Sequence, residues 1–242
     1  MRVDILTIFP RMFEGVLTES MLKIAQEKHI LRAKIHYLRD FTTDRHKSVD
    51  DRPYGGGPGM VMKVEPVVTA VRAIRQDEPE NPGRLLMMCP RGKKFDQAYA
   101  HELSAASRLI LIAGHYEGYD ERIVDCLQPE LISLGDFVLT GGELPALAVI
   151  DAVVRLLPGV LGDEDSIKSE SFAPDNEGLL EYPQYTRPRV FRGLEVPEVL
   201  LSGNHQAVAK WRAEQSARRS ENKVSGGHPP PTPTARVTWR AR

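Results

Sequence analysis

The chain has 242 residues, of which 41% are hydrophobic and 27% charged, and its formal net charge is −1. Such a chain can bury one large core, alone or beside a small second domain, and its near-neutral charge disfavours a protein that coats nucleic acid indiscriminately. No stretch approaches the roughly 18 uninterrupted apolar residues of a membrane helix, and the first residues lack a signal-peptide cleavage site. We therefore expect a cytoplasmic protein with no membrane partner.

Short apolar runs alternate with amphipathic segments along the first two thirds of the chain. We expect strands at 3–9, 31–39, 84–89 and 108–113, helices at 12–29, 65–76, 95–106, 120–127 and 141–158, and short segments at 131–135 and 136–139. Strands that alternate with helices predict an α/β fold, with a largely parallel sheet covered by helices on both faces.

The last third of the chain is organised differently. Residues 1–161 are expected to form the α/β domain and residues 162–182 an acidic connector, followed at 183–242 by a small, mainly helical domain with a helix at 204–219. Residues 201–242 contain eight Lys or Arg and two Glu. This basic end is either a solvated helix and tail or a surface for an RNA backbone, and disorder is left open for 220–242.

Glycine-rich loops follow three of the expected strands, at 89–94, 113–122 and 133–145. In an open α/β sheet, ligands bind at the carboxyl ends of the strands, so these loops predict one pocket in which backbone groups hold a ligand. The sequence has no G-x-G-x-x-G after its first strand, and GGGPGM is not followed by GK[ST], so neither a dinucleotide fold nor a P-loop is supported. Cys89 and Cys126 lack metal-ligand spacing and are expected to be buried thiols, so no metal site is predicted.

Six segments carry a resemblance to a known family. DRPYGGGPGM, AGHYEGYDER, LGDFVLTGGELPA, LLPGVLG, YPQYTRP and VPEVLLSGNH resemble, in this order, segments of the bacterial tRNA (guanine-N1)-methyltransferases, the TrmD type of the SPOUT superfamily. The resemblance spans about residues 1–218. It implies methyl transfer from S-adenosylmethionine to N1 of the guanine 3′ of the anticodon, tRNA position 37, in tRNAs with guanine at positions 36 and 37, a modification that prevents frameshifts. It also implies a homodimer and a deep trefoil knot.

The resemblance assigns the three glycine loops to the cofactor. The residues that it places there are Met87, Met88, Cys89, Pro90, Gly114, Tyr116, Glu117, Leu134, Gly135, Asp136, Phe137, Val138, Leu139, Gly141 and Gly142. Glycine backbone can hydrogen-bond the edges of adenine and ribose while apolar side chains cover their faces. Glu117 is the candidate acid near the cationic sulfonium, with a helix-start carboxylate as the alternative. His115 stands where the family usually has Arg.

The resemblance assigns the 51–60 loop to the tRNA. Its residues Arg52, Tyr54, Gly55, Gly56, Gly57 and Gly59 are placed against the anticodon loop. A thin glycine backbone can approach unstacked bases closely, and Tyr54 is expected either to stack on one of them or to cap the sheet edge.

Guanine N1 must lose a proton to act as a nucleophile, which calls for a base and for a cation near O6. The resemblance places the base at Glu170, where the family has Asp, and the cation at Arg155, with Mg²⁺ as an optional participant in proton abstraction. The alternatives are that Glu170 is a solvated linker charge beside other acids, and that Arg155 only complements a helix dipole. At the level of the whole chain, a SPOUT enzyme for ribosomal RNA and a non-catalytic RNA-binding module are the competing functions.

Overall fold

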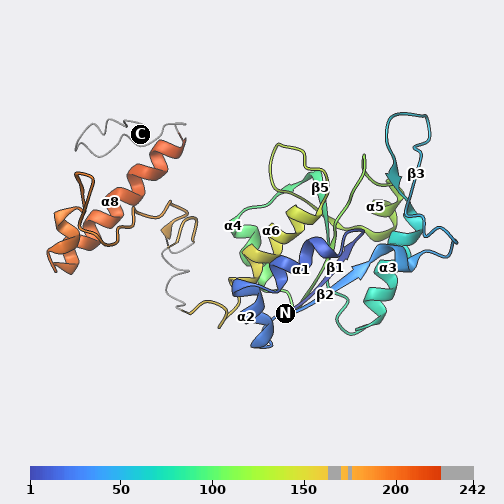
Figure 1. Ribbon diagram of the computed structural model, residues 1–242, viewed down its shortest axis with the longest axis horizontal. Helices are drawn as coiled ribbons and strands as arrows, with labels where there is room; N and C mark the ends of the chain where they lie inside the picture. The colour runs from blue at the N-terminus through green and yellow to red at the C-terminus, as the bar shows by residue number, and fades with distance from the viewer. Residues whose placement is uncertain (163–169, 174–175, 225–242) are drawn as a thin grey trace. The chain divides into compact units, whose positions relative to one another are not determined.

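The computed structural model describes residues 1–162, 170–173 and 176–224 (Figure 1). The chain divides into two compact units, residues 1–164 and 165–242. The first unit contains a five-stranded sheet in the order β2-β1-β6-β5-β7, and every pair of neighbours in it is parallel. Its strands are β1 (Arg2–Thr7), β2 (Arg32–Tyr37), β5 (Arg84–Lys94), β6 (Arg108–Ile112) and β7 (Glu130–Ser133). The predicted α/β class with a parallel sheet is confirmed.

Six helices flank the sheet. They are α1 (Arg11–Leu17), α2 (Ser20–Glu27), α3 (Val64–Gln76), α4 (Gln97–Ser104), α5 (Arg122–Leu127) and α6 (Glu143–Val154). The single helix expected at 12–29 is two helices, because Ser20 takes a positive φ of 51° and the side-chain amide of Gln26 donates to the carbonyl of Leu17 at 2.6 Å, ending α1 there. Periodicity alone cannot detect such a break, since the apolar pattern continues through it.

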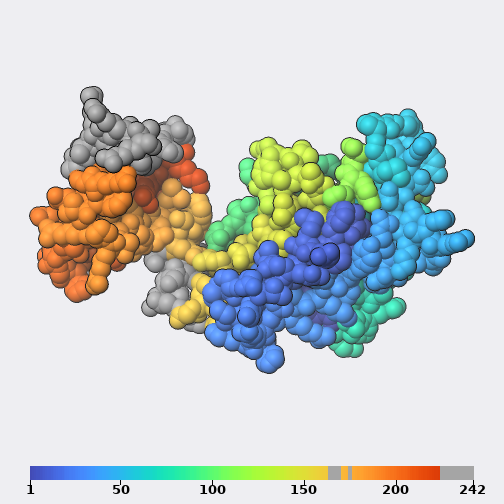
Figure 2. All heavy atoms as spheres, viewed as in Figure 1, coloured from blue at the N-terminus to red at the C-terminus, as the bar shows by residue number. Residues whose placement is uncertain are grey.

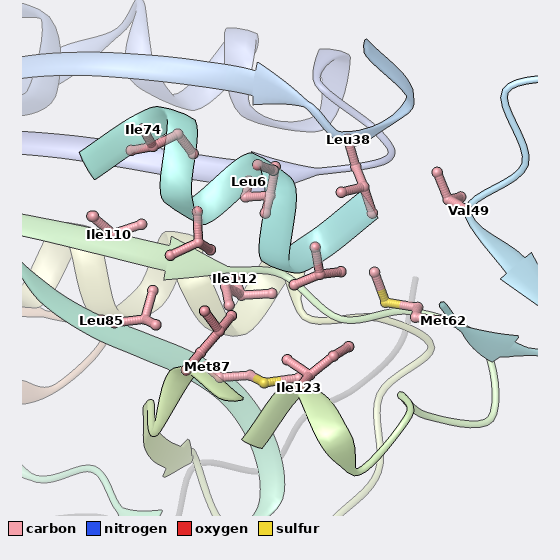
Figure 3. Packing of buried hydrophobic residues seen from close by; sticks show 14 of the residues in the cluster. Leu6, Leu38, Val49, Met62, Ile74, Leu85, Met87, Ile110, Ile112 and Ile123 are labelled. Atoms are coloured by element: carbon pink, nitrogen blue, oxygen red, sulfur yellow. The ribbon is translucent and has the colours of Figure 1, made fainter. Parts of the chain in front are cut away.

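One hydrophobic cluster of the first unit lies between the sheet and the pair α3 and α5 (Figure 3). Alternate residues of a strand point to the same face, and Leu6, Ile110 and Ile112 accordingly pack with Ile74 of α3 and Ile123 of α5. All of β1 and β6 is buried, as expected for central strands of a sheet covered on both sides.

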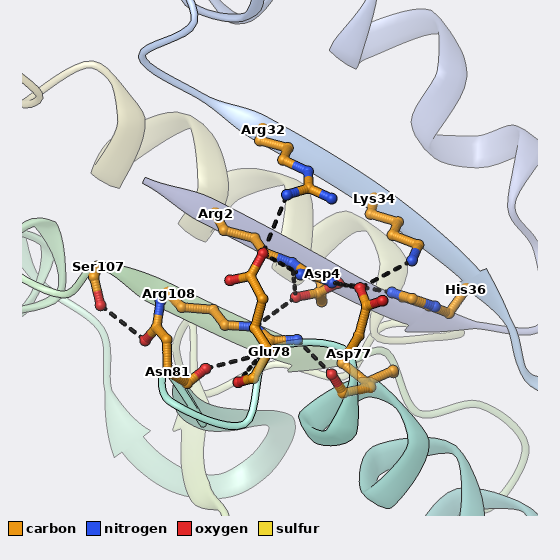
Figure 4. A network of polar contacts seen from close by, with 11 residues as sticks. Arg2, Asp4, Arg32, Lys34, His36, Asp77, Glu78, Asn81, Ser107 and Arg108 are labelled. Atoms are coloured by element: carbon orange, nitrogen blue, oxygen red, sulfur yellow. Dashed lines mark hydrogen bonds and ion pairs between the residues drawn. The ribbon is translucent and has the colours of Figure 1, made fainter.

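A charged cluster continues the same sheet face toward the amino ends of the strands (Figure 4). The Asp4 carboxylate is fully buried and accepts hydrogen bonds from Arg2 Nη2 and Arg108 Nε, both at 2.8 Å, and its Oδ1 lies 2.8 Å from His36 Nε2. Burial raises the pKa of Asp4, but its hydrogen bonds to His36, Arg2 and Arg108 together outweigh that effect and hold the pKa well below its usual range. The charged cluster thus closes the end of the core opposite the strand carboxyl ends.

The second unit is built around α8 (His205–Val224). A short antiparallel hairpin of β8 (Val190–Phe191) and β9 (Leu194–Glu195) and a 3-10 turn, η3 (Glu198–Leu201), precede this helix. The helix contacts the earlier chain of its own unit, because Ser216 donates to the carbonyl of Leu180, whose amide donates in turn to Ser220 Oγ at 2.8 Å. Because α8 extends to Val224, residues 220–224 are helical. Residues 225–242 lie outside the described part.

Candidate functional site

The carboxyl ends of β5, β6 and β7 surround a pocket with a cavity volume of about 160 Å³. The pocket is lined by Met88, Cys89, Pro90, Gly114, His115, Tyr116, Glu117, Gly118, Tyr119, Ile132, Ser133, Leu134, Gly135, Phe137, Val138, Leu139, Thr140, Gly141, Gly142 and Pro145. The segment expected as a loop at 89–94 belongs to β5, so one stretch of this strand and the loops after β6 and β7 meet at one sheet edge, where parallel α/β folds bind their ligands.

Local backbone geometry shapes each wall of this pocket. The ladder between β5 and β7 shifts register between Met88 and Lys93, so the residues between them leave the regular pairing beside the pocket. The loop after β6 and the start of α6 are joined by a hydrogen bond of 2.6 Å from the amide of Gly142 to the carbonyl of Gly114. A Cβ at residue 142 would lie 2.7 Å from the Gly114 nitrogen, so this approach requires glycine.

Most of the residues assigned to the cofactor by sequence line this pocket, and two do not. Met87 is fully buried within β5, and the side chain of Asp136 is 99% exposed. Other pocket residues, among them Tyr119, Ser133 and Pro145, were not among the candidates. They flank the assigned motifs directly, so extending each motif by a few residues toward its strand or helix would have included them.

A small polar group occupies the wall formed by β5 and the loop after β6. Tyr119 donates its hydroxyl proton to Cys89 Sγ at 3.2 Å and accepts a hydrogen bond of 3.0 Å from Arg91 Nη2. Burial, followed by the hydrogen bond to Cys89, raises the pKa of Tyr119 to about 12. This phenol therefore keeps its proton at neutral pH and is not a candidate base. Of the two thiols, Cys89 is buried as expected, whereas Cys126 is exposed.

The pocket suits a ligand such as S-adenosylmethionine. Leu134, Phe137 and Leu139 present apolar surface to it, and glycine backbone from the loops after β6 and β7 supplies N–H and C=O groups. Behind the Gly141–Gly142 turn lies the carboxylate of Glu143, which is buried and has one oxygen without a hydrogen-bond partner among the described residues. Apolar faces, backbone edges and one buried negative charge match a cationic nucleoside.

The 51–60 loop is attached to this pocket rather than separate from it. It connects β3 (Asp50–Asp51) to β4 (Val61–Met62) and projects from the first unit (Figures 1 and 2). The Glu117 amide donates to the Met60 carbonyl at 3.1 Å, and a Cβ at Gly59 would lie 2.4 Å from Glu117 Cγ. Glycine at position 59 therefore leaves space for the side chain of Glu117 in the same chain.

The outer part of the same loop is open. Gly55, Gly56 and Gly57 all have positive φ, and a Cβ added at Gly55 or Gly56 would have no atom within 4 Å. Tyr54 is fully exposed, so it does not cap the sheet edge. The tip of the loop thus presents backbone and one aromatic ring to solvent.

The two expected catalytic residues belong to different units. Arg155 is the C-cap residue of α6 in the first unit, whereas Glu170 lies in the second. The Glu170 carbonyl accepts hydrogen bonds from the Ala173 amide at 3.2 Å and from Asn176 Nδ2 at 3.4 Å, so its main chain is held in a turn.

Comparisons with known proteins address the family directly. The profile described as tRNA (Guanine-1)-methyltransferase TrmD matches residues 1–225. The chain belongs to this family. A relative from Carboxydothermus hydrogenoformans, named tRNA (guanine-N(1)-)-methyltransferase, is 58% identical over 93% of this chain and 89% of its own length. Relatives with the same name from Geobacillus kaustophilus and Dehalococcoides mccartyi are 54% and 52% identical over 91% of this chain and 88% and 87% of theirs.

Family membership confirms the recognition drawn from the six motifs, and with it a methyltransferase that uses S-adenosylmethionine. None of the helices in the described ranges is long and apolar enough to cross a membrane. Across those same ranges, no three His, Cys, Asp or Glu side chains are grouped so as to hold a metal ion.

Proposed function

We propose that this chain transfers the methyl group of S-adenosylmethionine to N1 of guanine 37 in tRNAs with guanine at positions 36 and 37. One observation carries the proposal: the glycine-lined pocket at the strand ends is hydrogen-bonded, through Glu117 and Met60, to a projecting glycine loop that presents an exposed aromatic ring. A cofactor site and a surface suited to unstacked bases thus lie on two segments of the first unit that are hydrogen-bonded to each other.

The residues of the pocket orient the cofactor, which supplies an electrophilic methyl group on a sulfonium. Glu170 removes the proton from guanine N1, so that the N–H bond breaks and the proton moves to the carboxylate. The N1 lone pair then forms the bond to the methyl carbon as the carbon–sulfur bond breaks, and the product S-adenosylhomocysteine is a neutral thioether. Arg155 faces the negative charge that develops on guanine O6. Mg²⁺ is proposed to assist proton removal.

The 51–60 loop is proposed to hold the anticodon loop. Arg52 pairs with a phosphate, Tyr54 stacks on a base, and the backbone amides of Gly55, Gly56 and Gly57 approach base or phosphate edges. The exposure of Tyr54 and the open space around these glycines support this assignment. Gly59 contributes differently, by admitting Glu117.

A homodimer is proposed on the basis of an exposed apolar stripe. Phe9, just before α1, and Met12 and Val16 on α1 are each 43% exposed, and Leu144 in the first turn of the neighbouring α6 is 53% exposed. The Phe9 ring meets His115 of the pocket edge-on at 4.8 Å. A second copy that covers this stripe would therefore lie beside the cofactor.

The remaining assignments follow from a tRNA substrate. We propose a domain boundary in the acidic connector 162–182, a tRNA-contacting role for residues 183–242, a deep trefoil knot in the first domain, and a cytoplasmic location. The positive charge of the last segment supports the contact with tRNA.

Methyl transfer from labelled S-adenosylmethionine to a tRNA transcript, and to its variant without guanine 37, tests the activity. We expect incorporation into the first transcript only. Incorporation into ribosomal RNA instead would favour the ribosomal enzyme, and RNA binding without incorporation would favour the non-catalytic module.

A further inference from the structure

Glu143 is a buried acid that the proposed reaction does not use. It is the first residue of α6, only 1% exposed, and it directly follows the Gly141–Gly142 turn that lines the pocket. An acid in the first turn of a helix interacts favourably with the helix dipole, but a carboxylate removed from water also needs hydrogen-bond donors. The groups around its two oxygens therefore indicate what it does.

One oxygen is satisfied by a relay from the end of β1. The Phe9 amide donates to Thr7 Oγ1 at 2.9 Å, and Thr7 Oγ1 lies 2.9 Å from Glu143 Oε1. Because a threonine hydroxyl has one proton and a carboxylate only accepts, Thr7 donates to Glu143. The polarity of this chain of hydrogen bonds is thus fixed.

The other oxygen faces the pocket wall. Glu143 Oε2 lies 3.5 Å from His115 Nδ1, and within the described part of the chain neither atom has a hydrogen-bond partner. His115 is partly exposed and lines the pocket. A proton on Nδ1, directed toward the carboxylate, would give both atoms a partner and would leave Nε2 as the second polar atom of the ring.

Gly141 leaves the space that this pair needs. A Cβ at residue 141 would lie 2.3 Å from Glu143 Oε2 and 2.4 Å from His115 Nδ1. The space that a side chain at residue 141 would occupy is thus filled by Glu143 and His115 of the same chain.

We propose that Glu143 is a positioning residue that fixes the tautomer of His115 and places a buried negative charge behind the cofactor pocket. This charge makes the site prefer a sulfonium cofactor over its neutral thioether product. The inference rests on the proposed use of S-adenosylmethionine. Of the described titratable side chains, Tyr116 contacts the His115 ring at 5.4 Å, and Glu117 lines the same pocket. On the β1 side the ring meets Phe9, and its own amide meets the Met62 sulfur, neither of which titrates.

The tautomer can be read on the unaltered protein. In nitrogen-15 NMR spectra of the histidine-labelled chain, recorded at a pH where the imidazole is neutral, we expect His115 to carry its proton on Nδ1. A proton on Nε2 would overturn the proposal. In Glu143→Gln the amide oxygen accepts from Thr7, so the amide nitrogen faces Nδ1 and the proton should move to Nε2.

Calorimetry tests the charge. We expect Glu143→Gln to weaken S-adenosylmethionine binding about tenfold, as for loss of a charged partner, and to weaken S-adenosylhomocysteine binding much less. Equal weakening of both ligands, or no change, would contradict the inference. If the unaltered chain binds neither ligand, the proposed function itself fails. Glu65→Gln, in the first turn of α3, is the matched control and should change neither affinity.

Variants of Thr7 test whether the oriented carboxylate of Glu143 or the packing around it sets the preference for the sulfonium ligand. Thr7→Ser keeps the hydroxyl that orients the carboxylate and should retain the preference for the sulfonium ligand. Thr7→Val keeps the shape but removes the donor. It should reduce that preference, and it should also lower the midpoint of thermal unfolding, because Glu143 Oε1 and the Phe9 amide both lose their partner. A preference that survives in Thr7→Val would exclude the relay.

Discussion

At the residue scale, the base proposed for methyl transfer is Glu170, at a position where the resemblance to the family implies Asp. Glu170 is one methylene longer than the Asp expected there, and its carbonyl is held by Ala173 and Asn176. The fixed main chain means that the reach of the side chain is set by its own length. Asp163, Glu164 and Asp165, which compete for the same role, lie outside the described residues.

Glu170→Gln should lower the single-turnover rate of methyl transfer by about 10²–10⁴-fold, because the amide keeps the shape but cannot accept the N1 proton. Binding of tRNA and cofactor should be nearly unchanged. Glu170→Asp should be milder, and Arg155→Ala should slow transfer without an additive effect in the double variant if the two act together. Near-normal transfer by Glu170→Gln at saturating substrates would move the role to a neighbouring acid.

At the element scale, the basic residues of α8 are not equivalent. Arg219 donates to the Glu181 carbonyl at 3.2 Å, and Lys223 Nζ lies 4.2 Å from the centroid of the Phe172 ring. Arg212 lies over the Tyr182 ring at 4.6 Å. Arg218 is exposed and makes no contact of this kind with the described residues. Part of the positive charge that the sequence suggested for RNA therefore holds the second unit together.

Arg218→Ala should weaken tRNA binding and reduce the slope of log affinity against log salt by about one, since one phosphate contact releases fewer counterions when it is lost. The midpoint of thermal unfolding of Arg218→Ala should stay unchanged. Arg219→Ala should also lower the midpoint, because it removes a contact within the unit. An unchanged salt slope in Arg218→Ala would mean that this face of α8 does not meet the RNA backbone.

At the scale of the whole molecule, the proposed homodimer rests on the apolar stripe of Phe9, Met12, Val16 and Leu144. Val16→Asp places a charge in this stripe and should shift the chain toward monomer in sedimentation velocity, because an unpaired charge is costly to bury. Leu201→Asp, at an exposed apolar residue of the second unit, is the control and should leave the association state unchanged. If Val16→Asp stays dimeric, the stripe is not the interface.

The charged cluster around Asp4 sets the acid stability of the first unit. The pKa of Asp4 is depressed in the folded state. The stabilising contribution of Asp4 is therefore present above the ordinary pKa of an Asp, about 4, and is lost as the pH falls below that value. Asp4→Asn should cost about 3–5 kcal/mol at pH 7, because it leaves Arg108 buried without its charged partner. Urea unfolding at pH 7 and at pH 3 should show a smaller stability difference for the variant than for the unaltered chain.

The sequence by itself determined the α/β class, the parallel sheet, the position of most helices and the family. These properties rest on local periodicity and on short motifs, and both can be read directly from the linear sequence. The break between α1 and α2 was missed because a single positive φ, at Ser20, leaves the apolar pattern intact.

The tertiary structure alone decided which groups face one another. Gly59 and Gly141 looked like backbone exposed for a ligand, yet the atoms that a Cβ would meet belong to Glu117 at one and to Glu143 and His115 at the other. Such contacts join residues from different strand ends, and no sequence spacing encodes them. The same holds for Asp4, which in sequence is one charge in an apolar run and in the fold is the centre of a buried charged cluster. A side chain is buried, and acquires its ion-pair or hydrogen-bond partners, only when distant segments meet, because removal from water is a property of the packed chain.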